Sequence, residues 1–313
     1  MAHFFHTPVL VKEVVTHLVH LPDGAYVDGT AGGGGHSEAI LKKLAGGGRL
    51  ICLDRDPDAV DSCRRRLTAY PNVCIIKANF ADLDEVVRDL HIKNINGVLL
   101  DLGMSSYQLE KSGRGFSFGR REPLDMRMNP ADRLTAYHLV NDLPLHDLEN
   151  ILRSYGEEKR ARSIARAIVR ARERGPIETA SQLGEIIDSA NPGSRRNRLR
   201  HPATRSFQAL RIAVNRELES LDRFLDKIPS LLCAGGRLVV LSYHSLEDRR
   251  VKQAMMAWER PCICPPDFPR CVCGRTPLFR RLFKKGIKPD PKEIQNNPRA
   301  RSAVMRAAER LAT

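Results

Sequence analysis

A run of four glycines at residues 32–35 follows a short apolar segment that ends at Asp28 and precedes a helix-like segment from Ser37. Because glycine has no Cβ, such a run lets the backbone turn sharply and lets a ligand approach it closely. A phosphate-cleaving P-loop would carry Lys and then Ser or Thr directly after a glycine. No glycine of this run is followed in that way, which excludes this class of nucleotide site.

Two ligand classes remain for the glycine loop. From Gly32 the sequence reads G-x-G-x-x-S, an imperfect match to the dinucleotide pattern. From Asp28 it reads D-x-T-x-G-x-G, which fits an S-adenosylmethionine loop with threonine in place of the first glycine. Asp28 would repel a pyrophosphate but suits the cationic amino group of a methionine moiety. The loop therefore favours a methyl donor, with a dinucleotide or a purely structural turn as alternatives.

A second carboxylate is expected beside this loop. Asp54 ends the next apolar segment, about twenty residues after the glycines, where a carboxylate can accept both hydroxyls of a ribose. Both ligand classes contain a ribose, so Asp54 supports a ligand with an adenosine part and does not discriminate between the two classes.

Four of the eight cysteines lie close together in the pattern C-x-C-x6-C-x-C. Four thiolates at this spacing could hold Zn²⁺ in a tetrahedral site. The spacing is not that of a standard zinc finger, so four reduced thiols in a surface loop are the alternative. The candidate ligands are Cys262, Cys264, Cys271 and Cys273.

Alternating apolar and helix-like segments predict how these residues are positioned. The alternation over the first hundred residues indicates an α/β fold, with a parallel sheet covered by helices on both faces. Strands are expected at 25–29, 49–54, 73–80 and 97–103, and helices at 37–44, 57–67 and 83–90. Such sheets bind ligands at the carboxyl ends of their strands, where we expect Asp28, Asp54, Phe80 and Asp101.

The middle of the chain predicts a separate helical domain. After a loop at 105–130, helices are expected near 132–141, 145–153, 157–174 and 179–190. An apolar stripe from Phe207 to Ile228 then predicts one long helix that Pro229 ends, and a strand is expected at 235–245. We therefore predict an α/β domain formed by residues 1–105 and 206–313, with a helical domain at 106–205 inserted after the fourth strand.

The charge pattern indicates a polyanionic partner. The net charge is +14 and the sequence pI is about 9.7. Residues 159–211 contain thirteen basic and four acidic side chains, so most of the excess falls in the predicted insertion. We favour RNA contact for residues 193–205, which have few apolar side chains to bury. For the helix at 159–174, RNA contact and a solvated outer face are equally compatible with the sequence.

The remaining composition points to the cytoplasm. The chain has no apolar span long enough to cross a membrane, and its first residues lack the pattern of a secretory signal. We therefore expect a cytoplasmic protein whose cysteines are reduced thiols or metal ligands. The sequence does not predict an oligomeric state.

Longer motifs resemble one known family over nearly the whole chain. The sequence is similar to the ribosomal RNA small subunit methyltransferase H family, formerly called MraW. The motifs that carry the resemblance occur in order and include HTPVL (6–10), DGTAGGGGHS (28–37), LLDLGMSSYQL (99–109), RGFSF (114–118), PLDMRM (123–128), HPATRSFQALRIAVN (201–215) and GGRLVVLSYHSLEDR (235–249).

The resemblance implies a fold, an activity and a set of site residues. The implied fold is a class I, Rossmann-like S-adenosylmethionine-dependent methyltransferase with an inserted helical domain. The implied reaction methylates the N4 amine of a cytidine in the decoding region of bacterial 16S rRNA, in the small ribosomal subunit. The cofactor positions that match the family are Gly34, Gly35, His36, Asp54, Phe80, Asp101 and Gln108.

A catalytic base is not identified by the sequence, and two residues are candidates. Asp101 ends the fourth strand, where it is a candidate base, although the resemblance makes it a cofactor contact first. His244 follows the fifth strand, where it would position the target base or serve a structural role.

Two other functions compete with the methyltransferase. A dinucleotide-dependent oxidoreductase is disfavoured by Asp28 ahead of an imperfect glycine pattern and by the basic insertion. A non-enzymatic RNA-binding factor on a methyltransferase fold would keep the glycine loop and Asp54 but lack turnover.

Overall fold

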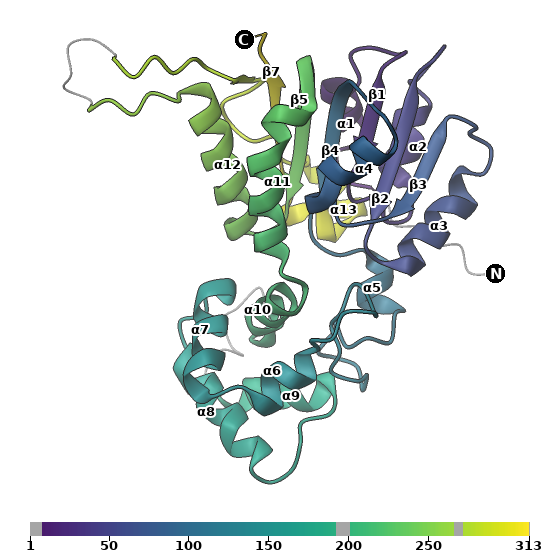
Figure 1. The fold of residues 1–313 in the computed structure, drawn as a ribbon. Coiled ribbons are helices and arrows are strands. Elements are labelled where there is room, and N and C mark those ends of the chain that lie inside the picture. The colour runs from purple at the N-terminus through teal and green to yellow at the C-terminus, as the bar shows by residue number, and fades with distance from the viewer. Residues whose placement is uncertain (1–7, 192–200, 266–271, 313) are drawn as a thin grey trace. The chain divides into compact units, whose positions relative to one another are not determined.

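The computed structural model describes residues 8–191, 201–265 and 272–312. The chain divides into two compact units (Figure 1). Unit 1 comprises Met1–Gly103 and Glu219–Thr313, and unit 2 is Met104–Leu218. The sequence placed the boundaries at 105/106 and 205/206. The second observed boundary lies thirteen residues later because helix α10 (Ala203–Asn215) packs with the helices of unit 2.

Unit 1 is built on one sheet, in which the described residues form seven strands in the order β3-β2-β1-β4-β5-β7-β6. Strands β1 to β5 are parallel, whereas β7 pairs antiparallel with both β5 and β6. The expected Rossmann-like α/β fold with a helical insertion is confirmed. The strands are β1 Ala25–Asp28, β2 Arg49–Asp54, β3 Val73–Lys77, β4 Ile95–Asp101, β5 Leu232–Ser242, β6 Phe279–Arg281 and β7 Val304–Arg310.

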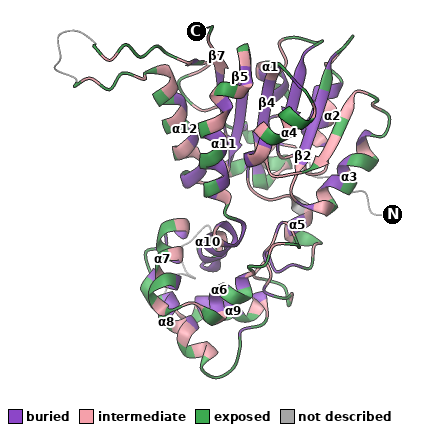
Figure 2. Ribbon diagram, in the orientation of Figure 1, coloured by how far each residue is buried: buried purple, intermediate pink, exposed green. Residues whose placement is uncertain are grey.

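Helices cover both faces of the sheet, and strands such as β4 and β5 are coloured mostly as buried in Figure 2. Apolar side chains pack between the sheet and the helices on each face. Alternate strand residues serve opposite faces, so Val27 packs with α4, α11 and α12, whereas Tyr26 packs with α1, α2 and α3. The helical elements of unit 1 are α1 Val11–Leu18, α2 Gly35–Leu41, α3 Pro57–Leu67, the 3₁₀ helix η1 Phe80–Asp82, α4 Leu83–Asp89, α11 Glu217–Leu231 (which begins in unit 2), α12 Ser245–Glu259, α13 Pro291–Asn296 and the 3₁₀ helix η2 Pro298–Ser302.

The strand order brings three carboxylates to one edge of the sheet. Strand β1 lies between β2 and β4, and this is where the order of the sheet reverses. Asp28, Asp54 and Asp101 are the last residues of these three parallel strands, as the sequence predicted. A crevice at such a reversal is where open α/β sheets bind their ligands. The fold therefore places the glycine loop that follows Asp28 at the expected binding edge.

Unit 2 is helical, with a core of its own. Its helices are α5 Ser106–Glu110, α6 Ala136–Asp142, α7 Leu145–Gly156, α8 Ala161–Arg172, α9 Ala180–Ser189 and α10 Ala203–Asn215. Leu148, Ile164 and Leu210 are fully buried in its apolar cluster. A Cβ on Gly156 would lie 2.8 Å from the Arg205 carbonyl oxygen, so glycine is needed where α7 approaches α10.

The apolar stripe from Phe207 to Ile228 is not one helix, which corrects the sequence prediction. Arg216 has a left-handed φ of 49° and ends α10, and α11 begins at the next residue. The first part of the stripe packs in the core of unit 2 and the second part in the core of unit 1. Pro229 also differs from its predicted role, because α11 continues past it to Leu231.

Among the described residues, no helix is both long enough and apolar enough to cross a membrane.

Candidate functional site: the glycine loop and its carboxylates

The glycine loop leaves β1 through two residues with left-handed backbone. Gly32 has φ 51° and Gly34 has φ 77°, a region that side chains with a Cβ rarely adopt. Gly33 has no such backbone requirement, and a Cβ added to it would meet no atom nearer than Ser62 Oγ at 4.0 Å. Neither strain nor packing therefore requires glycine at 33, and the space beside it can admit a ligand.

Asp28 holds the loop together from inside the fold. It is 1% exposed, the Ser37 hydroxyl donates to its Oδ2 at 2.6 Å, and the Thr30 N–H donates to its Oδ1 at 3.2 Å. Burial raises the pKa of its carboxyl. The sequence interpretation placed this carboxylate against a cationic ligand group. The structure instead assigns its oxygens to the loop and to α2.

Asp54 ties the loop to the end of β2. The Gly32 N–H donates to Asp54 Oδ2 at 2.9 Å, and the Asp56 N–H donates to Oδ1 at 2.9 Å. Burial raises the pKa of this carboxyl to about 6. Each oxygen still has lone-pair capacity after one such bond, and the side chain is partly exposed. Asp54 can therefore accept further hydrogen bonds from a ligand.

Asp101 is the centre of a partly buried polar group that sequence reasoning only partly found. The Tyr243 hydroxyl donates to Asp101 Oδ1 at 2.7 Å, and His36 Nδ1 lies 3.4 Å from Oδ2. The Asp101 N–H donates to the Thr30 hydroxyl at 2.6 Å, which joins β4 to the glycine loop. Sequence analysis missed Tyr243, although its position directly after β5 at the same edge was a usable signal.

The His36 ring lies in the interior of this group and not on the protein surface. The residue is 5% exposed, and Nε2 lies 2.8 Å from the Val9 carbonyl oxygen. Burial alone would lower the pKa of the imidazole, but the hydrogen bond to Asp101 and the nearby negative charges outweigh it, so the pKa is raised. The cofactor contact implied for His36 stays a prediction.

Phe80 lies close to its predicted place, although it does not end a strand. Strand β3 ends at Lys77, and Phe80 begins η1 with Asn79 as its cap. Its half-buried ring packs edge-on against Phe224, with ring centroids 5.7 Å apart. This contact fixes one side of the ring.

Gln108 belongs to unit 2, where it takes part in a helix cap. The Ser105 N–H donates to its Oε1 at 2.9 Å, and its own N–H donates to Ser105 Oγ at 3.2 Å. The cofactor role implied for Gln108 stays a prediction.

His244 forms the N-terminal cap of α12. The Glu247 N–H donates to its Nδ1 at 3.4 Å, and its Nε2 lies 3.1 Å from a Glu247 carboxylate oxygen. These contacts support the structural role that the sequence left open, and a catalytic role for His244 stays a prediction.

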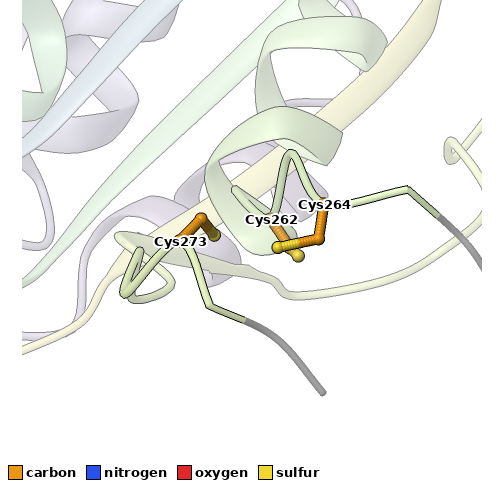
Figure 3. Close-up of side chains that lie close together, drawn as sticks. All are labelled: Cys262, Cys264 and Cys273. Carbon is orange, nitrogen blue, oxygen red and sulfur yellow. The ribbon is translucent and has the colours of Figure 1, made fainter. Parts of the chain in front are cut away.

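Three of the four predicted metal ligands come together (Figure 3). The sulfur atoms of Cys262, Cys264 and Cys273 all lie within 4.8 Å of one another. The fourth candidate, Cys271, lies outside the described residues.

An exposed arginine stripe runs along α8 in unit 2. Arg162, Arg166 and Arg170 recur every four residues on the face opposite the buried Ile164 and Ile168. None of the three guanidinium groups forms an ion pair with any residue that the structure describes. This arrangement is compatible with contact to a polyanion and with a solvated face, the two interpretations that the sequence left open.

The groove beside this stripe adds a surface that a partner could enter. An open groove of about 580 Å³ lies between α8 and α9, lined in part by Arg170 and Arg174.

Some of the thirteen basic residues at 159–211 form contacts within the protein instead. Arg172 donates to the Val140 and Leu143 carbonyl oxygens, and Arg211 forms a bidentate pair with Glu217 at 2.8 Å. Most of the segment 193–205, favoured for RNA contact, lies outside the described residues.

Sequence comparison assigns the family. The model of the MraW methylase family matches residues 3–311. The chain belongs to the MraW methylase family. This membership removes the dinucleotide oxidoreductase as an alternative, because the glycine loop is then that of a methylase.

Two relatives are similar over their full lengths, and each is named ribosomal RNA small subunit methyltransferase H. The protein from Heliobacterium modesticaldum is 47% identical over 310 residues, covering 98% of this chain and 99% of its own. The protein from Paenibacillus sp. strain JDR-2 is 47% identical over 315 residues, covering 98% of this chain and 100% of its own. Among solved structures, a putative rRNA-methylase from Clostridium thermocellum gives a TM-score of 0.44 at 12% identity, covering 96% of this chain and 95% of its own.

Proposed function

We propose that the protein transfers a methyl group from S-adenosylmethionine to the N4 amine of a cytidine in the decoding region of 16S rRNA, in the small ribosomal subunit. The observation that carries the proposal is the glycine loop at the reversal of the sheet, joined to Asp54 by the Gly32 N–H. The names of the full-length relatives support ribosomal RNA of the small subunit as the substrate.

The residues at this edge fit the methyl donor. Asp54 has oxygen lone pairs available for two ribose hydroxyls, and the Cβ side of Gly33 is open for the ligand. The half-buried Phe80 offers an aromatic surface for the adenine. In this proposal these three residues hold the nucleoside part of the donor, with Gly34 and Gly35 shaping the loop.

The proposed reaction requires little covalent catalysis by the protein. S-adenosylmethionine supplies a methyl group that is already activated by the positive charge on its sulfur. The cytosine amine is a weak nucleophile because its lone pair is conjugated with the ring. The protein therefore contributes mainly by aligning the nitrogen with the methyl group and the sulfur, and by offering acceptors to the amine.

Asp101 acts in this proposal as a positioning group and cofactor contact rather than as a general base. One Asp101 oxygen accepts a hydrogen bond from the Tyr243 hydroxyl, and the other faces His36. These two contacts hold the carboxylate in a fixed orientation. Burial first, and then the negative charge of Asp101, raise the pKa of Tyr243 well above its ordinary value. Tyr243 therefore remains a neutral hydrogen-bond donor at physiological pH.

Unit 2 supplies the RNA contact in this proposal. The arginine stripe Arg162, Arg166 and Arg170 would bind backbone phosphates, and arginine can also stack on unpaired bases.

Methyl incorporation tests the proposal. The protein is incubated with methyl-labelled S-adenosylmethionine and small subunits from a bacterial strain that lacks its own family member, with free 16S rRNA and large subunits in parallel. We expect label in the small-subunit RNA, and its loss with Asp54→Ala. Donor binding without label in any RNA would contradict the proposal and favour a non-enzymatic RNA-binding role.

A further inference from the structure

The three cysteines with adjacent sulfurs lie on an extended arm between α12 and β6. We define this arm as residues 260–278, of which 260–265 and 272–278 are described. Figure 1 shows these two segments running out from the end of α12 and back toward the sheet. Cys262 and Cys264 lie on the outgoing segment and Cys273 on the returning one, so the sulfur cluster joins the two.

Little apolar burial holds the described part of the arm in place. Of the three large apolar side chains in its described part, Ile263 and Val272 are 65% and 73% exposed, and only Leu278, at the base of the arm, packs on the core. Its base is anchored, because the Leu278 N–H donates to the Trp258 carbonyl at 2.9 Å and the Trp258 ring lies against Phe279. Segments that cannot bury a core commonly depend on a metal or on cross-links.

The sulfur geometry is close to that of a zinc thiolate site. Zn–S bonds of about 2.3 Å in a tetrahedron place neighbouring sulfurs about 3.8 Å apart. The three sulfurs here lie within 4.8 Å of one another, which is near the spacing that one shared ion requires. The Val272 N–H also lies 3.4 Å from Cys264 Sγ, where it can donate to a thiolate.

We propose that Cys262, Cys264 and Cys273 bind a structural Zn²⁺ ion that clamps the two segments of the arm. Soft thiolate ligands in a tetrahedral arrangement select zinc over harder divalent ions. Each thiol loses its proton on coordination, so affinity rises with pH. The sequence pattern predicts Cys271 as the fourth ligand, but the proposal rests on the three described cysteines. The site is separate from the methyl-donor residues, so neither proposal depends on the other.

Metal content of the full-length protein tests the site directly. The protein is purified in reducing buffer without chelators, and zinc is measured by plasma mass spectrometry. We expect about one zinc per chain. Cys262→Ser and Cys273→Ser should each weaken zinc binding by at least about tenfold, since even loss of a group that only orients a ligand has such an effect. Cys74→Ser is the matched control, because Cys74 is an exposed thiol on β3.

Cobalt substitution of the unaltered protein keeps the test independent of how the variants fold. We expect the visible bands of tetrahedral Co²⁺ together with thiolate-to-cobalt charge transfer, and competition by zinc. Absence of bound zinc and of this spectrum would overturn the proposal, as would equal metal retention in Cys262→Ser and Cys74→Ser. A disulfide among these cysteines that persists in reducing buffer and excludes metal would overturn it as well.

Discussion

At the scale of single residues, Asp54 should make the affinity for the methyl donor depend on pH. Desolvation of this partly exposed carboxyl raises its pKa to about 6. Only the ionised form can accept hydrogen bonds from both ribose hydroxyls on both oxygens. Affinity for S-adenosylmethionine should therefore be constant above this pKa and fall as the pH drops through it.

The pH effect can be measured by calorimetric titration of the donor. At pH 5 about one tenth of Asp54 is ionised, so we expect binding about tenfold weaker than at pH 8. In Asp54→Asn, affinity should be low at every pH, with no break near 6. That variant keeps His36 and Asp28, whose pKa values are also raised, so a break that persists in it would assign the titration to another group and contradict the role of Asp54.

Gly33 offers a second residue-scale prediction. The space beside Gly33 is open, so Gly33→Ala should fold normally but weaken donor binding by about tenfold or more, because the new methyl group occupies that space. The matched control is Gly47→Ala, since Gly47 likewise has no left-handed φ and no atom within 4 Å of an added Cβ. Calorimetry and urea unfolding would measure both. Equal donor affinity in the two variants would show that no ligand passes beside Gly33.

The sequence predicted which residues stand at the binding edge better than what each contacts. Asp28, Asp54 and Asp101 end their strands as expected, because apolar runs and their polar ends are local signals. That Asp28 bonds Thr30 and Ser37 depends on how the glycine loop folds back on β1. That Tyr243 meets Asp101 depends on two chain segments 142 residues apart. Side-chain partners of this kind are set by tertiary packing.

At the scale of elements, the loop before α6 is held by two buried polar side chains. Arg114 donates to the Arg127 and Met128 carbonyl oxygens. Asn215, the last residue of α10, accepts the Met128 N–H at 2.7 Å and donates to the Met126 carbonyl at 2.8 Å. A loop without regular hydrogen bonding is thus fixed to a helix end.

Removing the Asn215 amide should destabilise unit 2. Asn215→Ala leaves the buried Met128 N–H and Met126 carbonyl without this partner, at a cost of about 1–3 kcal/mol each. Urea unfolding of the full chain measures the loss. Asn150→Ala, at an exposed position of α7, should stay within about 0.5 kcal/mol. Equal stabilities of the two variants would contradict the role assigned to Asn215.

Helix periodicity in the sequence was informative within helices and misleading across a helix break. The helix Pro57–Leu67 has its predicted bounds, with a proline at its start and an Asp56 side-chain cap. The stripe from Phe207 to Ile228 keeps its spacing through Arg216, so nothing in it marks the left-handed residue. The break follows from two separate cores that each need part of the stripe.

At the scale of the whole molecule, the positive charge should appear in the salt dependence of RNA binding. Arg162, Arg166 and Arg170 are exposed and form no ion pair with the described residues. Replacing all three with Gln should weaken binding to small-subunit RNA and reduce the slope of log K against log salt by about two to three units.

A control variant with the same change in net charge separates the effect of where the arginines lie from the effect of net charge. Arg64, Arg65 and Arg88 are exposed arginines of unit 1, and replacing them with Gln removes the same three charges. Filter binding at several salt concentrations measures both variants. Equal changes in slope would mean that the α8 stripe has no special role.

The sequence predicted only part of the sheet topology. The parallel strands and the inserted helices were predicted, but β6 and β7 were not, because three- and seven-residue segments with polar side chains carry weak strand signals. The place of β7 between β5 and β6 depends on the long-range pairing that closes this edge of the sheet.

The identity of the methylated nucleoside tests the central claim most directly. Small subunits are treated with the protein and S-adenosylmethionine that carries a deuterated methyl group, the 16S rRNA is digested, and nucleosides and fragments are identified by mass spectrometry. We predict deuterated N4-methylcytidine at a single decoding-region position, absent with Asp54→Ala. A label on a ring carbon, a ribose oxygen or another base would contradict the proposed reaction even if the protein proves to be an active rRNA methylase.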